Sequence, residues 1–102
     1  MQEFRIKILP KVLKDLKEAK QWYNEQKEFL GDEFKFEVNK EFDYIEKNPF
    51  GYQIRFKEFR KSLLNRFPYC IYYVVEESIR KIIVFGVLHN KSGDEKIMKR
   101  LK

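Results

Sequence analysis

Apolar and polar residues follow their clearest pattern between positions 60 and 89. Apolar and aromatic side chains occupy alternate positions from Phe67 to Val75, as on one face of a β-strand. A second apolar run covers residues 82–88, and the polar segment 76–78 separates the two runs. This arrangement predicts an antiparallel hairpin. Because the opposite faces of both runs are also largely apolar, we expect both faces to be covered and the two strands to be central in a sheet.

The N-terminal part of the chain predicts a strand followed by a helix. Residues 4–8 alternate apolar with charged side chains, and Pro10 suits the first position of a helix. Spacings of three and four residues then predict a helix with one buried stripe, formed by Val12, Leu13, Leu16, Ala19, Trp22, Tyr23 and Leu30. We expect Gly31 to end this helix in the left-handed conformation and Asp32 to cap the next one.

A second helix follows at once, so the two helices should form an antiparallel hairpin. Its predicted buried face consists of Phe34, Val38, Phe42 and Ile45. The pair Asn48-Pro49 should end it, because a residue before proline avoids the helical conformation. Alternation over residues 53–57 predicts a further strand that continues, with a bulge, to residue 64, and the polar tail after His89 predicts a short helix.

These elements together predict an α+β fold. We expect one domain over residues 1–102, with an N-terminal strand and an antiparallel helical hairpin packed on a three- to four-stranded, mainly antiparallel sheet.

The amino-acid composition limits the kinds of partner and of active site that we expect. Lys and Arg outnumber Asp and Glu by 22 to 16, and this net charge of +6 favours an anionic partner, either nucleic acid or an acidic protein segment. The single cysteine, Cys70, excludes an internal disulfide, and the single histidine, His89, excludes a zinc site built on histidines. No Asp-His or Ser-His spacing lies near His89, so the sequence gives no argument for a hydrolase triad. We therefore expect no metal and no cofactor. The sequence shows no signal peptide and no run of about 20 apolar residues, so a cytoplasmic protein without membrane contact is expected.

Several short motifs occur in a fixed order between residues 4 and 92. They are Asp15-Leu16 followed by Trp22-Tyr23, Gly31-x-x-Phe34, Ile45-x-x-Asn48-Pro49, Arg66-Phe67-Pro68-Tyr69-x-Ile71-x-Tyr73 and Val87-Leu88-His89. In this set and order the chain resembles the RelE/ParE superfamily of toxins from bacterial type II toxin–antitoxin pairs. The resemblance implies a small basic protein that halts growth until a co-encoded antitoxin wraps around it. RelE-like members cleave mRNA in the ribosome, and ParE-like members poison DNA gyrase.

The resemblance also implies where a RelE-like nuclease would place its catalytic residues. Such members use lysines on the strand after the helices, an arginine in the next strand, and an arginine and a tyrosine near the C-terminus. Here the strand arginine falls on Cys70, whose neutral thiol cannot hold a phosphate, and the tail contains no tyrosine. The remaining nuclease candidates are Arg55, Lys57, Arg66, Lys91 and Arg100.

The Arg-Phe-Pro-Tyr motif at residues 66–69 is common in ParE-like members and favours that branch. We therefore expect a toxin that acts on DNA gyrase without catalysis of its own and binds an antitoxin encoded by a neighbouring gene. Two alternatives stay open: a nuclease acting on mRNA in the ribosome, and an inactive relative that only binds antitoxin. The candidates for contact with the target or with nucleic acid are Arg55, Lys57, Arg60, Lys61, Arg66, Tyr69 and His89.

Overall fold

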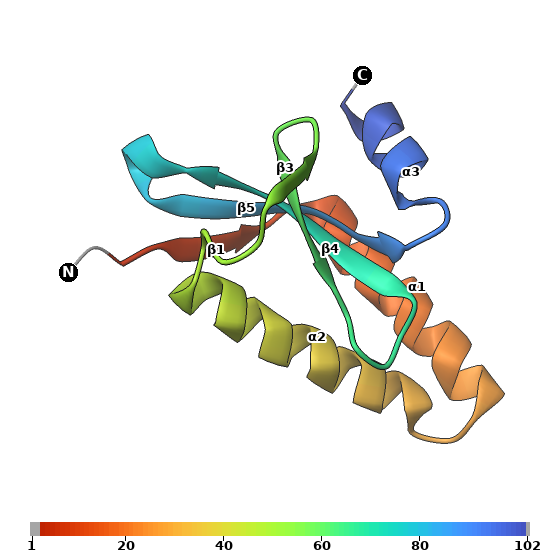
Figure 1. The fold of residues 1–102 in the computed structure, drawn as a ribbon. Helices are drawn as coiled ribbons and strands as arrows, with labels where there is room; N and C mark the ends of the chain where they lie inside the picture. Colours follow the sequence, from red (N-terminus) through yellow and green to blue (C-terminus); the bar gives the residue numbers. More distant parts are fainter. Residues whose placement is uncertain (1–2, 102) are drawn as a thin grey trace.

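The computed structural model describes residues 3–101 and shows an α+β fold built on one mixed sheet (Figure 1). In chain order the elements are β1 (Arg5–Ile8), α1 (Pro10–Gln26), α2 (Leu30–Lys47), β2 (Ile54–Phe56), β3 (Phe59–Leu63), β4 (Tyr69–Glu76), the 3₁₀ helix η1 (Glu77–Ile79), β5 (Lys81–His89) and α3 (Gly93–Arg100). Among these residues, no helix has the length and apolar character needed to cross a membrane.

The predicted hairpin of residues 67–88 is confirmed as β4 and β5, which lie inside the sheet. The strand order is β1-β5-β4-β3-β2, so β4 is the middle strand and β5 lies between it and β1. Strand β1 pairs with β5 in parallel, from Arg5 opposite Lys81 to Ile8 opposite Val84, and all other pairs are antiparallel. The predicted fold class is therefore confirmed, although the sheet of five strands is larger than the three or four expected.

The prediction of one bulged strand over residues 53–64 is wrong. Lys57 takes the left-handed conformation with φ of 52°, and the chain reverses there between β2 and β3. Non-glycine residues seldom adopt this conformation, so nothing in the local sequence marks the turn. This extra hairpin adds a strand to the sheet and makes β2 its edge.

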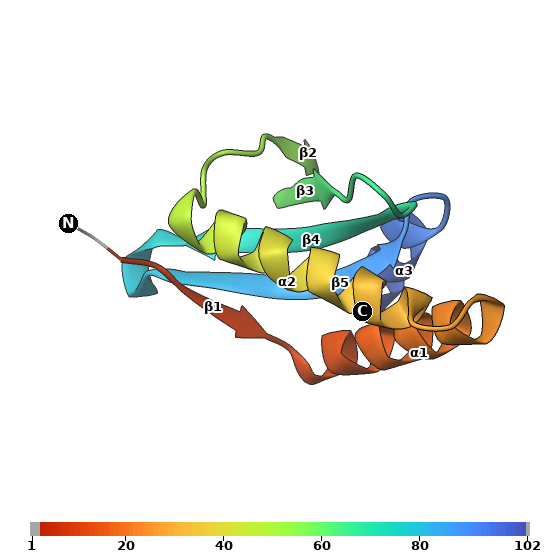
Figure 2. The same cartoon turned by 90° about the horizontal axis from the view of Figure 1, so that it is seen from below.

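The helical hairpin covers one face of the sheet, as predicted (Figure 2). All four residues of the predicted α2 stripe are buried, and Pro10 begins α1. In α1 the predicted stripe is too wide, because Leu13 and Trp22 are 59% and 54% exposed, whereas Val12, Ala19 and Tyr23 are buried. Tyr23 packs against the sheet, and Trp22 lies outside the core.

The predicted roles of Gly31 and Asp32 are wrong. Phe29, with φ of 66°, takes the left-handed position before α2, and Gly31 lies within the first turn of that helix. A Cβ atom at Gly31 would overlap the carbonyl oxygen of Lys20, so glycine lets the two helices approach closely. Asp32 makes no side-chain cap, and its charge in the first turn suits the positive end of the helix dipole.

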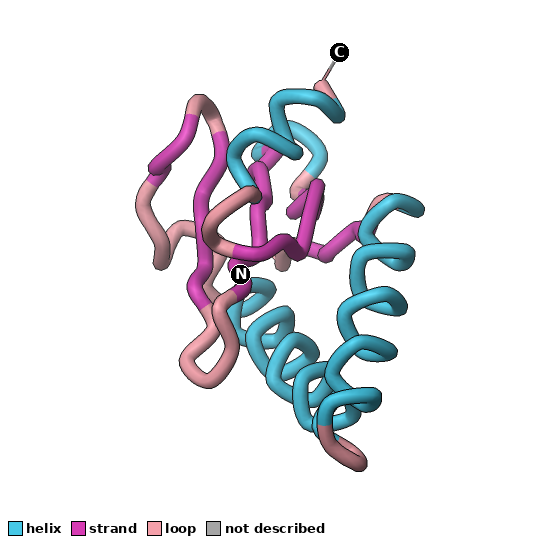
Figure 3. Tube along the Cα trace, turned by 90° about the vertical axis from the view of Figure 1, so that its right-hand side faces the viewer, coloured by secondary structure: helices cyan, strands magenta, loops and turns pink. Residues whose placement is uncertain are grey.

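The opposite face of the sheet is covered by α3, the helix expected in the tail (Figure 3). Residues of β4 alternate between the two faces: Ile71 and Tyr73 point to the helical hairpin, while Cys70 and Tyr72 join the cluster around Ile97 of α3. The expectation that both faces of the β4–β5 hairpin are covered is therefore confirmed.

Candidate functional site

The basic residues predicted as candidates on β2, on β3 and in the turn between them differ in their interactions with the rest of the protein. Arg55 lies on edge strand β2 and Lys57 in the following turn, and both are exposed. Within residues 3–101, neither makes an ion pair. By contrast, Nη1 of Arg60 donates to the carbonyl oxygen of Tyr52 at 2.5 Å, and its guanidinium lies 5.2 Å from the centre of the Phe50 ring. Arg60 therefore fastens the loop after α2 to β3.

Lys61 and Arg66 also have structural partners. Nζ of Lys61 lies 3.0 Å from a carboxylate oxygen of Asp94 and so links β3 to α3. Nη2 of Arg66 lies 2.7 Å from Glu33 at the start of α2, in an exposed pair of the kind that contributes little stability. Lys61 and Arg55 both line an open pocket of about 490 Å³ beside β2. The basic surface of the β2–β3 hairpin thus has two exposed cations, Arg55 and Lys57, without an ion pair among residues 3–101, and Arg55 lines a pocket that a partner can reach.

Beneath α3, Cys70 is sealed from solvent. It is fully buried, and burial raises the pKa of its thiol. Burial also raises the pKa of neighbouring Tyr72, whose hydroxyl donates to Asp94 at 2.5 Å. Burial alone would disfavour the Asp94 carboxylate, but hydrogen bonds from Tyr72 and Lys61 outweigh it and lower its pKa. The position that the family resemblance assigns to an arginine is therefore a neutral thiol under a helix.

Arg100, at the end of α3, is held by Asp15 of α1. Its Nη2 lies 2.5 Å from one Asp15 oxygen and its Nη1 2.8 Å from the other, and Nη1 also donates to the carbonyl oxygen of Phe85 at 2.9 Å. The hydrogen bond to Asp15 raises the pKa of Arg100. The Arg100 side chain is only 19% exposed and that of Asp15 only 7%, so this largely buried ion pair tethers α3 to α1.

The remaining candidates lie at the ends of β4 and β5. Tyr69 pairs with His89 across the two strands, and their rings are 5.5 Å apart. Nδ1 of His89 accepts a hydrogen bond from the backbone nitrogen of Lys91, whose side chain is exposed. The five nuclease candidates are thus distributed over β2, the β2–β3 turn, the loop before β4, the loop after β5 and the end of α3.

Within residues 3–101, no three His, Cys, Asp or Glu side chains gather to hold a metal ion.

Sequence reasoning missed the residues that dock α3, namely Asp15, Asp94 and Ile97. The available signal was the pair Ile97-Met98, which supplies the two large apolar side chains of an otherwise charged segment over residues 93–100.

Comparison with known proteins identifies the fold. No family model matches this chain, and no curated protein matches it at a significant level. A chain in the solved structure of the chromosomal ParDE TA system from P. aeruginosa is similar to it, with a TM-score of 0.75 and 13% identity, over 85% of this chain and 96% of that chain. At this identity the likeness concerns the fold. It confirms the RelE/ParE-like fold expected from the sequence motifs.

Proposed function

We propose that this protein is the toxin of a type II toxin–antitoxin pair and that it inhibits growth through ParE-like contact with DNA gyrase. The observation that carries the proposal is the fold shared with a chain of the ParDE TA system. The Arg-Phe-Pro-Tyr motif at residues 66–69, just before and at the start of β4, adds support because it resembles the motif common in ParE-like members.

The face of the sheet under α3 argues against a RelE-like nuclease. Cleavage of RNA without a metal requires cations placed to hold the charge that develops on phosphate. The thiol of Cys70 is buried and neutral, and the guanidinium of Arg100 is occupied by Asp15. Loss of one preorganised charge typically costs about 10²–10³ in rate, so two losses leave little catalysis.

The positive net charge of the protein indicates what kind of antitoxin segment it would bind. A surface with net charge +6 favours an acidic, partly disordered segment that folds on contact, supplied by the product of a neighbouring gene. Because part of the attraction acts between exposed charges, added salt should weaken binding.

Induced expression in a bacterium tests the target. We expect growth arrest with the DNA-damage response induced and message intact, and purified protein should inhibit DNA supercoiling by gyrase. Co-expression of the neighbouring gene should restore growth. Codon-specific cuts in ribosome-bound message, detected by primer extension, would instead support the nuclease. Antitoxin binding without growth arrest would support the inactive relative.

A paired variant tests the basic surface of the β2–β3 hairpin. The double variant Arg55→Glu/Lys57→Glu reverses the two charges of this surface and should abolish growth arrest. It should still fold, because both side chains are exposed. The matched control is Lys35→Glu, an exposed lysine of α2, which should leave growth arrest intact. Equal toxicity of the double variant and the control would exclude this surface as the contact.

A further inference from the structure

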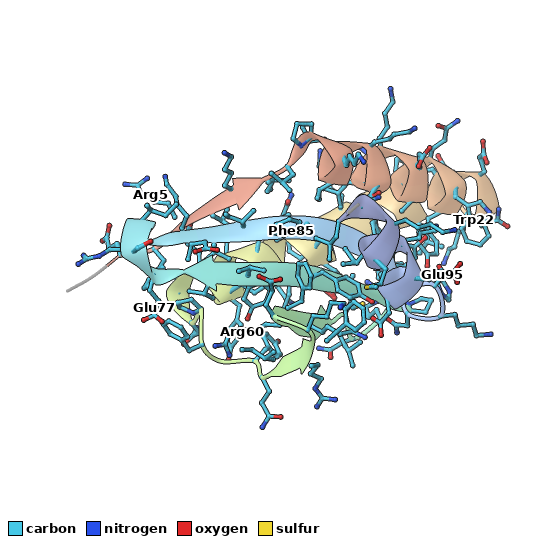
Figure 4. The ribbon with its side chains drawn as sticks, turned by 90° about the horizontal axis from the view of Figure 1, so that it is seen from above. Arg5, Trp22, Arg60, Glu77, Phe85 and Glu95 are labelled. Carbon is cyan, nitrogen blue, oxygen red and sulfur yellow. The ribbon has the colours of Figure 1, made fainter. Side chains whose placement is uncertain are left out.

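Near one edge of the sheet, Arg100 of α3 forms an ion pair with Asp15 of α1, and this pair joins the two helices across a seam between them. Figure 4 shows Trp22 of α1 and Glu95 of α3 at the same end of the molecule. Two pockets of about 240 Å³ each open along this seam, and Lys96 lines both of them. The seam is distinct from the basic surface of the β2–β3 hairpin, which lies at the far edge of the sheet.

The first pocket is cationic. Its four described lining side chains are Lys11, Lys96, Lys99 and Arg100. Arg100 is neutralised by Asp15, and Lys99 has only an exposed pair with Glu95 at 3.4 Å. Lys11 and Lys96 make no ion pair with any carboxylate of residues 3–101. Ammonium groups gathered in this way repel one another unless an anion lies between them, and phosphate is an anion that lysine binds well.

The second pocket is aromatic. Trp22, Tyr69 and His89 line it, over a floor that includes Val87 and Leu88. The rings of Trp22 and Tyr23 are nearly perpendicular, with centres 5.1 Å apart, and Trp22 is 54% exposed, so much of this aromatic residue is left in water. Exposed aromatic faces stack on nucleobases at single-stranded sites, whatever the base.

We propose that the seam between α1 and α3 binds single-stranded nucleic acid, with phosphate in the cationic pocket and a base against Trp22. Because Lys96 borders both pockets, a phosphate bound in the cationic pocket would lie next to a base stacked on Trp22. The phosphate and base of a nucleotide are neighbours in the same way. Lys11 and Trp22 are about 16 Å apart along α1 at 1.5 Å per residue, which suits a short strand segment.

The charges of the aromatic pocket favour nucleic acid over an acidic peptide. Glu18 lines that pocket, and its carboxylate would repel the carboxylates of such a peptide, whereas Asp15, which also lines it, is neutralised by Arg100. A nucleobase is different, since its amino groups donate hydrogen bonds that a carboxylate accepts. The proposal does not depend on gyrase as a target, because it concerns a different surface.

The protein carries its own reporter for the test, because Trp22 is its only tryptophan. The intact chain is titrated with a DNA hexamer, an RNA hexamer, inorganic polyphosphate and polyglutamate, and tryptophan emission is recorded. Both hexamers should change the emission saturably. With about three phosphates neutralised, the logarithm of the binding constant should fall with the logarithm of salt concentration at a slope near −2.

Variants assign the two halves of the site. Lys96→Gln should weaken binding and reduce the salt slope by about 0.7, whereas Lys35→Gln, at an exposed site on α2, should change neither. Trp22→Ala, followed with a labelled hexamer, should weaken binding about 10-fold through loss of stacking. All three side chains are at the surface, and circular dichroism checks that each variant folds.

Three results would overturn the proposal. The first is no saturable binding of either hexamer at low salt. The second is binding of polyglutamate as tight as that of the hexamers, which would assign the seam to an acidic protein segment. The third is unchanged hexamer affinity in Trp22→Ala together with equal affinity for polyphosphate, which would leave a phosphate site only. If the protein gives any of these results and still arrests growth through gyrase, the nucleic-acid proposal has failed while the proposed function stands.

Discussion

The two faces of the sheet are covered in different ways. On one face, the 17 residues of α1 and the 18 of α2 bury a broad aromatic and aliphatic core in which Tyr23, Phe34 and Phe67 contact one another. On the other face, the eight residues of α3 place one fully buried apolar side chain, Ile97, on the sheet. Polar links hold this helix near each end, through Asp94 and Arg100.

The difference teaches how a short polar helix can be fixed. An isolated helix of eight residues is unstable in water, so α3 depends on its contacts with the sheet. Apolar burial is roughly proportional to area and is shared among many residues, whereas a charged anchor depends on a few atoms in one geometry. Single substitutions should therefore act differently on the two faces.

The largest effect is expected on the helical-hairpin face. Phe34→Ala should lower the free energy of unfolding by about 3–5 kcal/mol, because the fully buried ring contacts Tyr23, Phe67 and Tyr69. Phe36→Ala, on the same helix but 66% exposed, is the control and should cost less than about 0.5 kcal/mol. Urea unfolding measures both, and equal losses would mean that the buried face of α2 is misassigned.

On the α3 face, Arg100→Met should lower the free energy of unfolding by about 3 kcal/mol, since it leaves the Asp15 carboxylate buried without its partner. Asp15→Leu/Arg100→Met should recover part of this loss, because no unpaired charge then remains. The control is Lys99→Met, which removes an exposed pair and should cost about 0.5 kcal/mol or less. A loss in Arg100→Met no larger than in this control would show that the ion pair does not hold α3.

Two glycines compare the tightness of the two helix contacts. Alanine normally stabilises a helix over glycine by about 1 kcal/mol, but Gly31→Ala and Gly93→Ala should each destabilise by about 1–3 kcal/mol. Gly31→Ala should be the worse, because its Cβ would overlap a backbone oxygen of Lys20, whereas at Gly93 the Cβ meets the less closely placed ring and hydroxyl of the buried Tyr72. Thermal melts test the order, with Gly51→Ala at an exposed turn as the control.

The smallest effect is the acid sensitivity of the α3 anchor. The pKa of Asp94 is lowered in the folded protein from its ordinary 3.8, so its contribution to stability is present above that value and is lost as the pH falls through the folded pKa. Asp94→Asn should therefore be less stable than the parent at pH 7, and the difference should shrink toward pH 3. Urea unfolding at the two pH values checks this, and a difference that stays constant would contradict it.

The sequence predicted what local periodicity encodes. The two-residue period of β4 and the 3.6-residue period of α2 placed the hairpin and the buried stripe correctly. Gly31 was misread because glycine serves a left-handed turn and a close helix contact equally well, and only the packed structure separates these uses. The turn at Lys57 was missed because its left-handed backbone has no glycine to mark it.

The candidate site was harder to predict because its contacts join distant parts of the chain. Arg100 and Asp15 are 85 residues apart, and no local pattern pairs them. Basic residues could be identified as a group, but which of them are occupied by Tyr52, Glu33 or Asp94 depends on tertiary structure.

The parallel pairing of β1 with β5 has a consequence for the order of folding. It joins the residues beginning at Arg5 to those beginning at Lys81, so a large loop must close before either strand gains its hydrogen bonds. The helical hairpin needs only neighbouring residues and can form early, whereas β1 must wait for the last strand to be synthesised. We expect refolding slower than that of a helical protein of this size, with the N-terminal strand among the last parts to dock.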